Sequence, residues 1–349
     1  MRKKMQTHEQ PMVVANDDGF IEPPITDNFG RIFDYLRLAV NDQCNLRCIY
    51  CMPEKGIPFL GKDKLLETKD VKRLINIFSS LGVSKIRFTG GEPLLRKDIF
   101  ELIQYSSELP EIDTVHMTTN GVLLPSYLNQ LERAGLSGLN ISLDTLRPDR
   151  FKSITRRNHF QDVMQGLDMA FSSRIHSIKV NVVTMKEFND DEILDFVELT
   201  RENDIIVRFI ELMPFDSHQI WKTGKFYSAE KIIGHLEKNI KGLRPSSGSK
   251  TEHHAFEIDG YKGKVAVIPA FTRSLCNNCN RIRITADGKL LNCLYSRSET
   301  DLLREMINGS SDGDIKDLIR ESMRNKLMDG WLSQRDGKDQ RESMTQIGG

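Results

Sequence analysis

The sequence contains no run of about 18 apolar residues, the length that a helix needs to cross a bilayer. Its N-terminus, Met1–Gln10, is basic and then polar, so it lacks the apolar stretch of a secretory signal. Neither sign of charge is in excess, because 49 Lys and Arg residues balance 49 Asp and Glu residues. Proteins that coat nucleic acid normally carry a basic excess. We therefore expect a cytoplasmic protein with no membrane and no nucleic-acid partner, and the composition leaves a homodimer open.

Several common catalytic signatures are also missing. No Walker-type phosphate loop is present, because Gly242 and the stretch Gly248-Ser249-Lys250-Thr251 have the wrong spacing and order. No Ser-His-Asp or H-E-x-x-H arrangement is visible, and the eight His residues are dispersed. A nucleotide substrate would therefore be held by strands and metal centres, without P-loop hydrolysis.

Six cysteines are present, and they form two groups of three. The groups are Cys44, Cys48 and Cys51, spaced C-x3-C-x2-C, and Cys276, Cys279 and Cys293, spaced C-x2-C-x13-C. Disulfide frameworks belong to short secreted domains, so this chain of 349 residues favours metal ligation. Three thiolates can hold three irons of a cubane cluster and leave the fourth iron open. Zinc is the alternative, above all for the second group, where His253 or His254 would complete four ligands.

From about residue 32 the chain alternates β-rich runs with amphipathic segments. The runs are Ile32–Val40, Ser84–Thr89, Ile112–Thr118, Gly138–Leu143, Ser177–Thr184 and Ile205–Leu212. Strands alternating with helices such as 69–81 imply right-handed βαβ units, and thus an α/β fold with an open or closed barrel. After about residue 215 the pattern changes to two antiparallel hairpins, Phe256–Ile268 and Arg281–Leu294, and a helix around 314–328.

The pattern divides the chain into a flexible N-terminal arm at 1–30, a barrel core at 31–215 and a C-terminal extension at 216–349. Unusual residues gather where the predicted strands end. The first cysteine group follows the first strand, Gly90-Gly91-Glu92-Pro93 follows the second, and Ser142 ends the fourth. Because the reactive face of α/β barrels lies at the C-terminal ends of the strands, we expect a single shared cavity there.

The motif C-x3-C-x-aromatic-C after the first strand, followed by Gly-Gly-Glu-Pro after the second, resembles the signature of the radical S-adenosylmethionine (SAM) enzymes. The resemblance implies a partial (βα)6 TIM-like radical SAM barrel whose first [4Fe-4S] cluster has three Cys ligands. In that family the open iron chelates SAM, and an electron from the cluster cleaves SAM to methionine and a 5′-deoxyadenosyl radical. The pair Gly90-Gly91, lacking Cβ atoms, would let the backbone approach the methionine ammonium.

The surroundings of the second cysteine group carry a closer resemblance. Cys279-Asn-Arg-Ile-Arg283, then Asp287-Gly288 and Cys293-Leu294, resemble the molybdenum-cofactor biosynthesis protein A family, the GTP 3′,8-cyclases. Arg208-Phe-Ile-Glu-Leu-Met-Pro214 and the terminal Gly348-Gly349 also match, and the resemblance covers residues 31–349. Phe88 departs from it, since Leu is expected there. The resemblance implies a second [4Fe-4S] cluster, again with three Cys ligands, in the C-terminal extension, and a Gly-Gly tail that reaches into the active site.

This resemblance implies an enzyme, a carbon-carbon lyase that binds GTP. The 5′-deoxyadenosyl radical would abstract H3′ of GTP, and C3′ would attack C8 to give (8S)-3′,8-cyclo-7,8-dihydroguanosine 5′-triphosphate for molybdopterin synthesis. A reductant protein would supply electrons, and a cyclic pyranopterin monophosphate synthase would act on the product. Two alternatives remain: a radical SAM enzyme whose auxiliary cluster serves a peptide substrate, and a zinc-stabilised binding module.

The resemblance also assigns residues by motif. The expected SAM contacts are Tyr50, Gly91, Ser142 and Met213. The expected GTP contacts are Arg37, Arg87, Thr118, Lys179, Arg281, Ile282 and Arg283, with Ile282 contributing main chain and with Lys85 and Arg208 as weaker phosphate candidates. Charge supports this set independently, because a nucleoside triphosphate carries about four negative charges and suits several inward basic side chains. Period two places Arg281 and Arg283 on one face of a strand.

Overall fold

The computed structural model describes residues 22–213, 223–246, 253–335, 341 and 343–347. These residues build a 12-stranded sheet in the order β12-β11-β10-β1-β2-β3-β4-β5-β6-β9-β8-β7. The six core strands are β1 (Tyr35–Ala39), β2 (Lys85–Thr89), β3 (Thr114–Thr119), β4 (Gly138–Ser142), β5 (Ser177–Thr184) and β6 (Ile205–Glu211). All neighbouring core strands pair in parallel, which confirms the predicted α/β core.

The core strands are buried on both faces, but the two faces differ in chemistry. In β1, Leu36 and Leu38 are fully buried in the apolar core, whereas Tyr35 and Arg37 line a cavity on the other face. Successive side chains of a strand point to opposite faces, so one short strand serves both environments. The same alternation recurs along the sheet and gives the cavity a polar wall.

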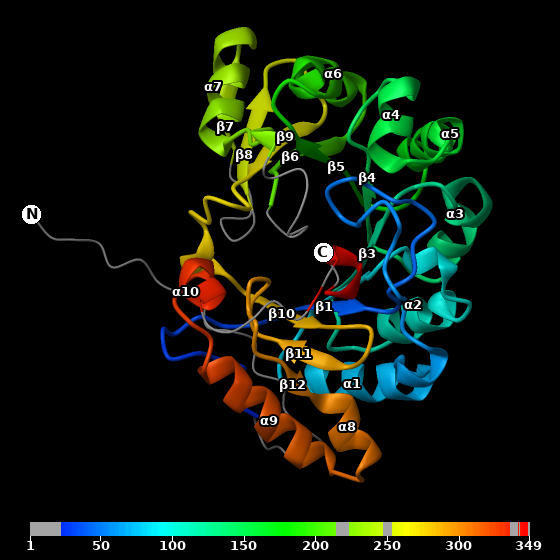
Figure 1. Ribbon diagram of the computed structural model, residues 1–349, viewed down its shortest axis with the longest axis vertical. Coiled ribbons are helices and arrows are strands. Elements are labelled where there is room, and N and C mark those ends of the chain that lie inside the picture. The colour runs from blue at the N-terminus through cyan, green and yellow to red at the C-terminus, as the bar shows by residue number, and fades with distance from the viewer. Residues whose placement is uncertain (1–21, 214–222, 247–252, 336–340, 342, 348–349) are drawn as a thin grey trace, which may run out of the picture.

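Helices cover the outer face of the curved sheet (Figure 1). Side chains on the inner face line the cavity. They are α1 (Thr68–Ser80), α2 (Ile99–Ser107), α3 (Leu124–Arg133), α4 (Pro148–Thr155), α5 (Phe160–Phe171) and α6 (Ile193–Glu202). In α1 the buried positions recur every three or four residues, from Val71 through Leu74 and Ile75 to Phe78, as an amphipathic helix requires. No helix in the described part of the chain is both long and apolar enough to span a bilayer.

The C-terminal extension adds strands to both edges of this core. β9 (Lys264–Ile268) pairs in parallel with β6, and β10 (Arg281–Ile284) pairs in parallel with β1. The remaining elements are β7 (Leu243–Pro245), β8 (His254–Ile258), β11 (Lys289–Leu291), β12 (Thr300–Asp301), α7 (Ala229–Asn239), α8 (Leu302–Ile307), α9 (Asp312–Arg324) and α10 (Gly330–Arg335). Both predicted hairpins form, as β8–β9 and β10–β11. Because β7 and β12 are the two ends of the described sheet, its strands make an open barrel.

The described part of the predicted N-terminal arm is packed against the fold. Ile25 is fully buried, and Thr26 forms an antiparallel bridge with Ile32. The Glu22 carboxylate lies 2.5 Å from both Lys316 Nζ and Arg320 Nη2 on α9. Residues 22–30 therefore belong to the folded body, and residues 1–21 of the predicted arm lie outside the described residues.

Candidate active site

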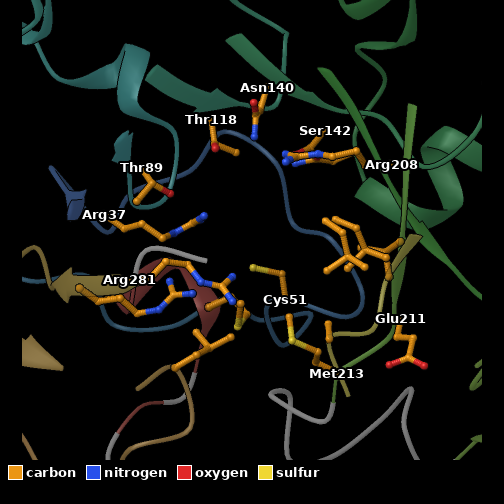
Figure 2. Close-up of a pocket in the computed structure, with 18 of the residues that line it drawn as sticks. Arg37, Cys51, Thr89, Thr118, Asn140, Ser142, Arg208, Glu211, Met213 and Arg281 are labelled. Atoms are coloured by element: carbon orange, nitrogen blue, oxygen red, sulfur yellow. The ribbon is translucent and has the colours of Figure 1, made fainter. Parts of the chain in front are cut away.

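The carboxyl ends of the parallel strands surround a cavity of about 340 Å³. Both cysteine groups line it, and all six cysteines are free thiols. Figure 2 shows part of its wall, with side chains from several strands directed into one space. The shared cavity predicted from the strand ends is therefore present, and it brings together thiols about 230 positions apart in the sequence.

Two glycines allow the first cysteine loop to lie against the end of β2. A Cβ atom on Gly90 would stand 2.2 Å from the Asn41 carbonyl oxygen, and one on Gly91 would stand 2.0 Å from that of Gln43. The backbone N–H groups of Gly91 and Glu92 donate to the same two carbonyls at 2.9 and 2.7 Å. The glycine pair thus has a reason that the sequence did not reveal, because no side chain fits between this loop and β2.

Glu92 is completely buried beneath the first cysteine loop. Its carboxylate accepts hydrogen bonds from Leu94 N at 3.0 Å, the Thr119 hydroxyl at 2.9 Å and Asn120 N at 2.8 Å. Burial raises the pKa of Glu92 to about 7, although these three donors act in the opposite direction. The Asn120 side chain in turn donates to Cys44 Sγ at 3.6 Å. Glu92 therefore orients a hydrogen-bond donor toward the first cysteine.

Tyr50 ties the same loop to the ends of β4 and β5. Its hydroxyl donates to Asp144 Oδ2 at 2.6 Å, and Asp144 Oδ1 accepts from Val183 N at 2.8 Å. Burial raises the pKa of Asp144 to about 6 and that of the Cys51 thiol to about 12. A bound metal deprotonates a coordinating thiol outright, so these dry thiols would become thiolates when metal binds.

A segment near the C-terminus covers the first cysteine loop. The Ser343 hydroxyl donates to the Cys51 carbonyl at 2.9 Å, and Ile347 is buried. Between them, two residues of the short helix η6 (Met344–Gln346) line the cavity, Met344 and Thr345. Figure 1 shows this red segment inside the curve of the sheet. The predicted tail residues Gly348-Gly349 lie outside the described residues.

Cys276 begins the short helix η5 (Cys276–Asn278), Cys279 directly follows this helix, and Cys293 lies in the loop after β11. Burial raises the pKa of Cys276. Burial acts in the same way on Cys279, but the positive charges of Lys326 and Arg281 outweigh it and lower the pKa to about 6. This thiol is therefore mostly a thiolate at neutral pH, the form that ligates metal.

Three arginines line the cavity from two neighbouring strands. In the parallel pair, Arg37 of β1 lies opposite Arg283 of β10, and Arg281 stands two residues earlier on the same face. Figure 2 shows Arg37 and Arg281 reaching into the cavity. Burial lowers the pKa of Arg283, and the charges of Arg37 and Arg281 lower it further. Three guanidinium groups so close together repel each other, which raises the electrostatic free energy of the empty cavity. A bound polyanion would offset this repulsion.

Most residues predicted for the site line this one cavity. Besides the six cysteines, they are Arg37, Tyr50, Gly91, Thr118, Ser142, Met213, Arg281 and Arg283, together with Arg208. Four predicted residues are not among the described lining residues: Lys85, Arg87, Lys179 and Ile282. The Ile282 side chain is fully buried in the apolar core. The main-chain contact of Ile282 with GTP stays a prediction.

Arg87 departs most clearly from the prediction of direct contact with GTP. Its side chain is 1% exposed and lies beneath the lining residues Tyr35 and Thr118. Nε donates to the Tyr35 hydroxyl, and Nη1 donates to Thr118 Oγ1 at 3.4 Å. Lys179 stands two residues before the lining residue Asn181 on β5, on the same face of the strand. Arg87 is thus covered by lining residues, whereas Lys179 is only partly buried.

Sequence reasoning missed several polar lining residues. They are Thr89, Asn140, Asn181, Glu211, Arg273, Tyr295 and Lys326. Those on core strands could have been found from the period-two alternation, because Asn140 stands two residues before Ser142, and Asn181 lies opposite Ser142 in register. In Figure 2, Arg208 extends toward Ser142, and its Nε donates to Asn181 Oδ1 at 2.9 Å.

The chemistry of the lining residues fits iron–sulfur clusters. The Cys44 sulfur accepts from Leu46 N at 3.4 Å, in addition to its Asn120 donor, and such contacts to sulfur are typical of cluster thiolates. Within the described residues, no three His, Cys, Asp or Glu side chains approach closely enough to hold a single metal ion. A cubane takes each thiolate on a different iron, so its cysteines need not converge on one point. Neither His253 nor His254, the predicted fourth zinc ligands, is among the described lining residues.

Comparison with known proteins agrees with this arrangement. Residues 38–200 match the family model of the radical SAM superfamily, and residues 205–329 match that of Molybdenum Cofactor Synthesis C. In fold, the chain is similar to Streptococcus suis SuiB, solved bound to S-adenosylmethionine, with a TM-score of 0.56 and 15% identity, covering 90% of this chain and 70% of that one.

Two curated relatives are much closer in sequence. The GTP 3′,8-cyclase of Chlorobaculum tepidum is 45% identical over 325 residues, which cover 93% of this chain and 97% of the relative. Molybdenum cofactor biosynthesis protein 1 of Drosophila melanogaster is 44% identical over 307 residues, covering 87% of this chain and 54% of the relative. The chain therefore belongs to the radical SAM superfamily and, within it, to the GTP 3′,8-cyclase family.

Proposed function

We propose that this chain is a radical SAM enzyme that cyclises GTP to a 3′,8-cyclo-7,8-dihydroguanosine triphosphate in molybdenum-cofactor biosynthesis. Its membership of the GTP 3′,8-cyclase family supports the activity. The observation that carries the proposal is the single cavity, in which Arg37, Arg281 and Arg283 face the same space as two cysteine groups. A polyanionic substrate would thus be held beside both metal sites.

We infer a place for each cofactor from the residues that line the cavity. Cys44, Cys48 and Cys51 would hold one [4Fe-4S] cluster, and the second group would hold another, each with three ligands. When bound, the first cluster would supply the electron for reductive cleavage of SAM, which is the chemistry that hydrogen abstraction from the ribose of GTP requires. Tyr50, Gly91, Ser142 and Met213 would hold SAM, since all four line the cavity.

The chain's own task is to bind, orient and exclude water. The arginines of β1 and β10 would take the triphosphate through charge-assisted, bidentate hydrogen bonds. Thr118 lines the same wall, and Arg87 supports it from beneath. Met344 and Thr345 close the space beside the first cysteine loop. Such positioning would bring C3′ of the ribose near C8 of the base, where the new bond forms.

Two further partners follow from the proposed chemistry. Reductive cleavage of SAM consumes an electron, so a reductant protein must supply the first cluster. The cyclised triphosphate must then be rearranged by an enzyme that acts on it, the cyclic pyranopterin monophosphate synthase of the predicted pathway.

The charged cavity wall disfavours the peptide alternative, because a neutral peptide offers no anionic group to pair with three arginines.

The direct test is turnover by the anaerobically reconstituted chain with SAM, GTP and a chemical reductant. We expect 5′-deoxyadenosine and the cyclised nucleotide to appear together. Formation of 5′-deoxyadenosine only when a peptide is supplied would favour the alternative enzyme. Zinc without iron in the purified protein would exclude both radical functions.

The two cysteine groups should separate in function. Cys48→Ala should abolish SAM cleavage, because the open-iron geometry needs all three thiolates of the first group. Cys279→Ala should remove about half of the iron and leave some SAM cleavage without cyclised product. Iron analysis and product quantification test both variants. Equal loss of SAM cleavage in two folded variants that each retain one cluster would contradict this division of roles.

A further inference from the structure

One buried arginine joins the N-terminal segment to the second cysteine group. Arg31 lies before β1, and its side chain is only 7% exposed. Its Nε pairs with Asp27 Oδ2 at 2.5 Å, and the Asp27 side chain is fully buried. Its Nη1 donates to the carbonyl of Cys276 at 2.9 Å. A guanidinium from before the first core strand thus contacts the backbone of a predicted metal ligand.

The same guanidinium also holds the connection between α9 and α10. Nη1 donates to the Met328 carbonyl and Nη2 to the Leu327 carbonyl, both at 2.8 Å. One side chain therefore donates hydrogen bonds to three carbonyls from two separate segments of the chain. Arginine suits this position because its planar group presents five donors in a rigid fork, whereas lysine offers a single point charge.

The next residues along the segment contact the surroundings of the other two cysteines. Asp34 Oδ1 accepts from Asn280 Nδ2 at 2.7 Å, directly after the second cysteine of the group. The Lys326 ammonium lies 5.3 Å from the centre of the Phe33 ring and donates to the Asn292 carbonyl, directly before the third cysteine. The segment 27–34 thus touches, directly or through one side chain, the backbone around all three thiols.

We propose that Arg31, anchored by Asp27, is a positioning residue of the second metal site, and that the segment 27–34 is a structural part of that site. The inference rests on the proposed function only in assigning a cluster to the second cysteine group. Without Arg31 the Cys276 carbonyl loses this donor, and η5, a single short turn, loses its tie to the core. The thiol it carries is then no longer held toward the cavity.

The test is iron loading and electron paramagnetic resonance of Arg31→Gln in the full chain, reconstituted anaerobically. The wild-type chain should bind about eight irons, four for each of two clusters. Arg31→Gln should bind about four, and its remaining signal should still shift on addition of SAM, which identifies the first cluster. Arg31→Lys keeps the charge without the fork and should lose an intermediate amount.

Arg73→Gln is the matched control, because Arg73 also bridges a carboxylate and a carbonyl, Asp312 at 2.8 Å and Ser310 at 2.6 Å, without touching either cysteine group. It should retain about eight irons. Full loading and an unchanged spectrum in Arg31→Gln would overturn the inference, as would equal iron loss in the control. If Arg31→Gln does not fold, full loading of Arg31→Lys overturns it. A wild-type chain with about four irons would refute the second cluster itself, and the inference with it.

Discussion

Arg283 is buried beside Arg37 and Arg281, and its burial and both neighbours lower its pKa. Burying a charge carries a large desolvation penalty, and negative charge on Cys279 and Cys293 offsets part of it by raising the pKa of Arg283. A nucleoside triphosphate carries about four negative charges and would supply compensation to all three side chains at once. At the scale of single residues, the cavity is therefore organised around an anion.

Replacing Arg281 or Arg283 by Ala should weaken GTP binding about ten- to hundredfold, since a hydrogen bond to a charged group contributes about 1.5–3 kcal/mol. SAM binding should be unchanged, because the predicted SAM contacts lie on other strands and loops. Calorimetric titration of each ligand measures both effects. The control is Arg304→Ala, which replaces an exposed residue of α8. Unchanged GTP affinity in both cavity variants would make these arginines ordinary structural cations.

Glu92 gives a second prediction at this scale, through its raised pKa. Its pKa of about 7 in the folded chain exceeds the ordinary value of 4.5. The folded state therefore binds the proton more tightly, and this contribution to stability is full below about pH 4.5 and is lost as pH rises through about 7. Glu92→Gln should remove this pH dependence. The free energy of unfolding of the wild type minus that of the variant should therefore be largest at low pH, and it should fall by up to about 3 kcal/mol as the pH rises. Denaturant unfolding of the metal-free chain between pH 4.5 and 8 measures it, and a pH-independent difference would contradict the prediction.

The C-terminal segment shows how a single element completes the cavity wall. Arg341 lies before it and pairs with Glu299 at 2.7 Å and with Asp287, at the β10–β11 turn, at 3.1 Å. Only 14% of the Arg341 side chain is exposed, so solvent screens these ion pairs weakly. Ser343 then binds the first cysteine loop. The segment is thus attached both to the β10–β11 hairpin and to the first cysteine loop.

Arg341→Ala should lower the free energy of unfolding by about 3 kcal/mol, because removing one partner of a buried pair leaves the other charges uncompensated. It should also lower the yield of cyclised nucleotide per 5′-deoxyadenosine, since Met344 and Thr345 would no longer be held at the cavity. Unfolding titrations and product ratios measure the two effects. A stability loss with an unchanged product ratio would show that the ion pairs serve the fold alone.

At the scale of the whole molecule, the extension and the barrel core share one sheet. β9 covers the edge of β6, and β10 covers the edge of β1. Unpaired strand edges are templates for aggregation, and natural proteins cover or blunt them. The boundary at residue 215 therefore divides the sequence into two parts, but strands from both parts are hydrogen-bonded in one continuous sheet.

A chain limited to residues 31–215 should aggregate, because two parallel strand edges become exposed together with the apolar surface under the extension. Size-exclusion chromatography and light scattering test this outcome. A chain that begins at residue 22 is the matched control, since it keeps every described contact, and it should elute like the full chain. A monomeric, iron-loaded 31–215 fragment would contradict the prediction.

The strands and helices of the core were largely predictable, because their patterns involve residues close in sequence. The predicted strand Ser177–Thr184 has the same bounds as β5, and the predicted helix 69–81 differs from α1 by one residue at each end. The predicted hairpin Arg281–Leu294 also has a local cause, since Gly288 adopts a positive φ of 74° at its turn. Cysteine spacing likewise indicated two groups of thiols, and both groups line the cavity.

Other features depend on contacts between distant parts of the chain, which no local pattern reports. Tyr35 pairs with Arg281 across the β1–β10 ladder, and this register places Arg37 beside Arg283. Arg87 has the same inward-facing pattern as Arg37, yet Tyr35 and Thr118 cover it. Residue type and periodicity thus established which chemistry the chain carries. The packing of strands and loops established which groups reach the cavity, because burial depends on neighbours that the fold alone brings together.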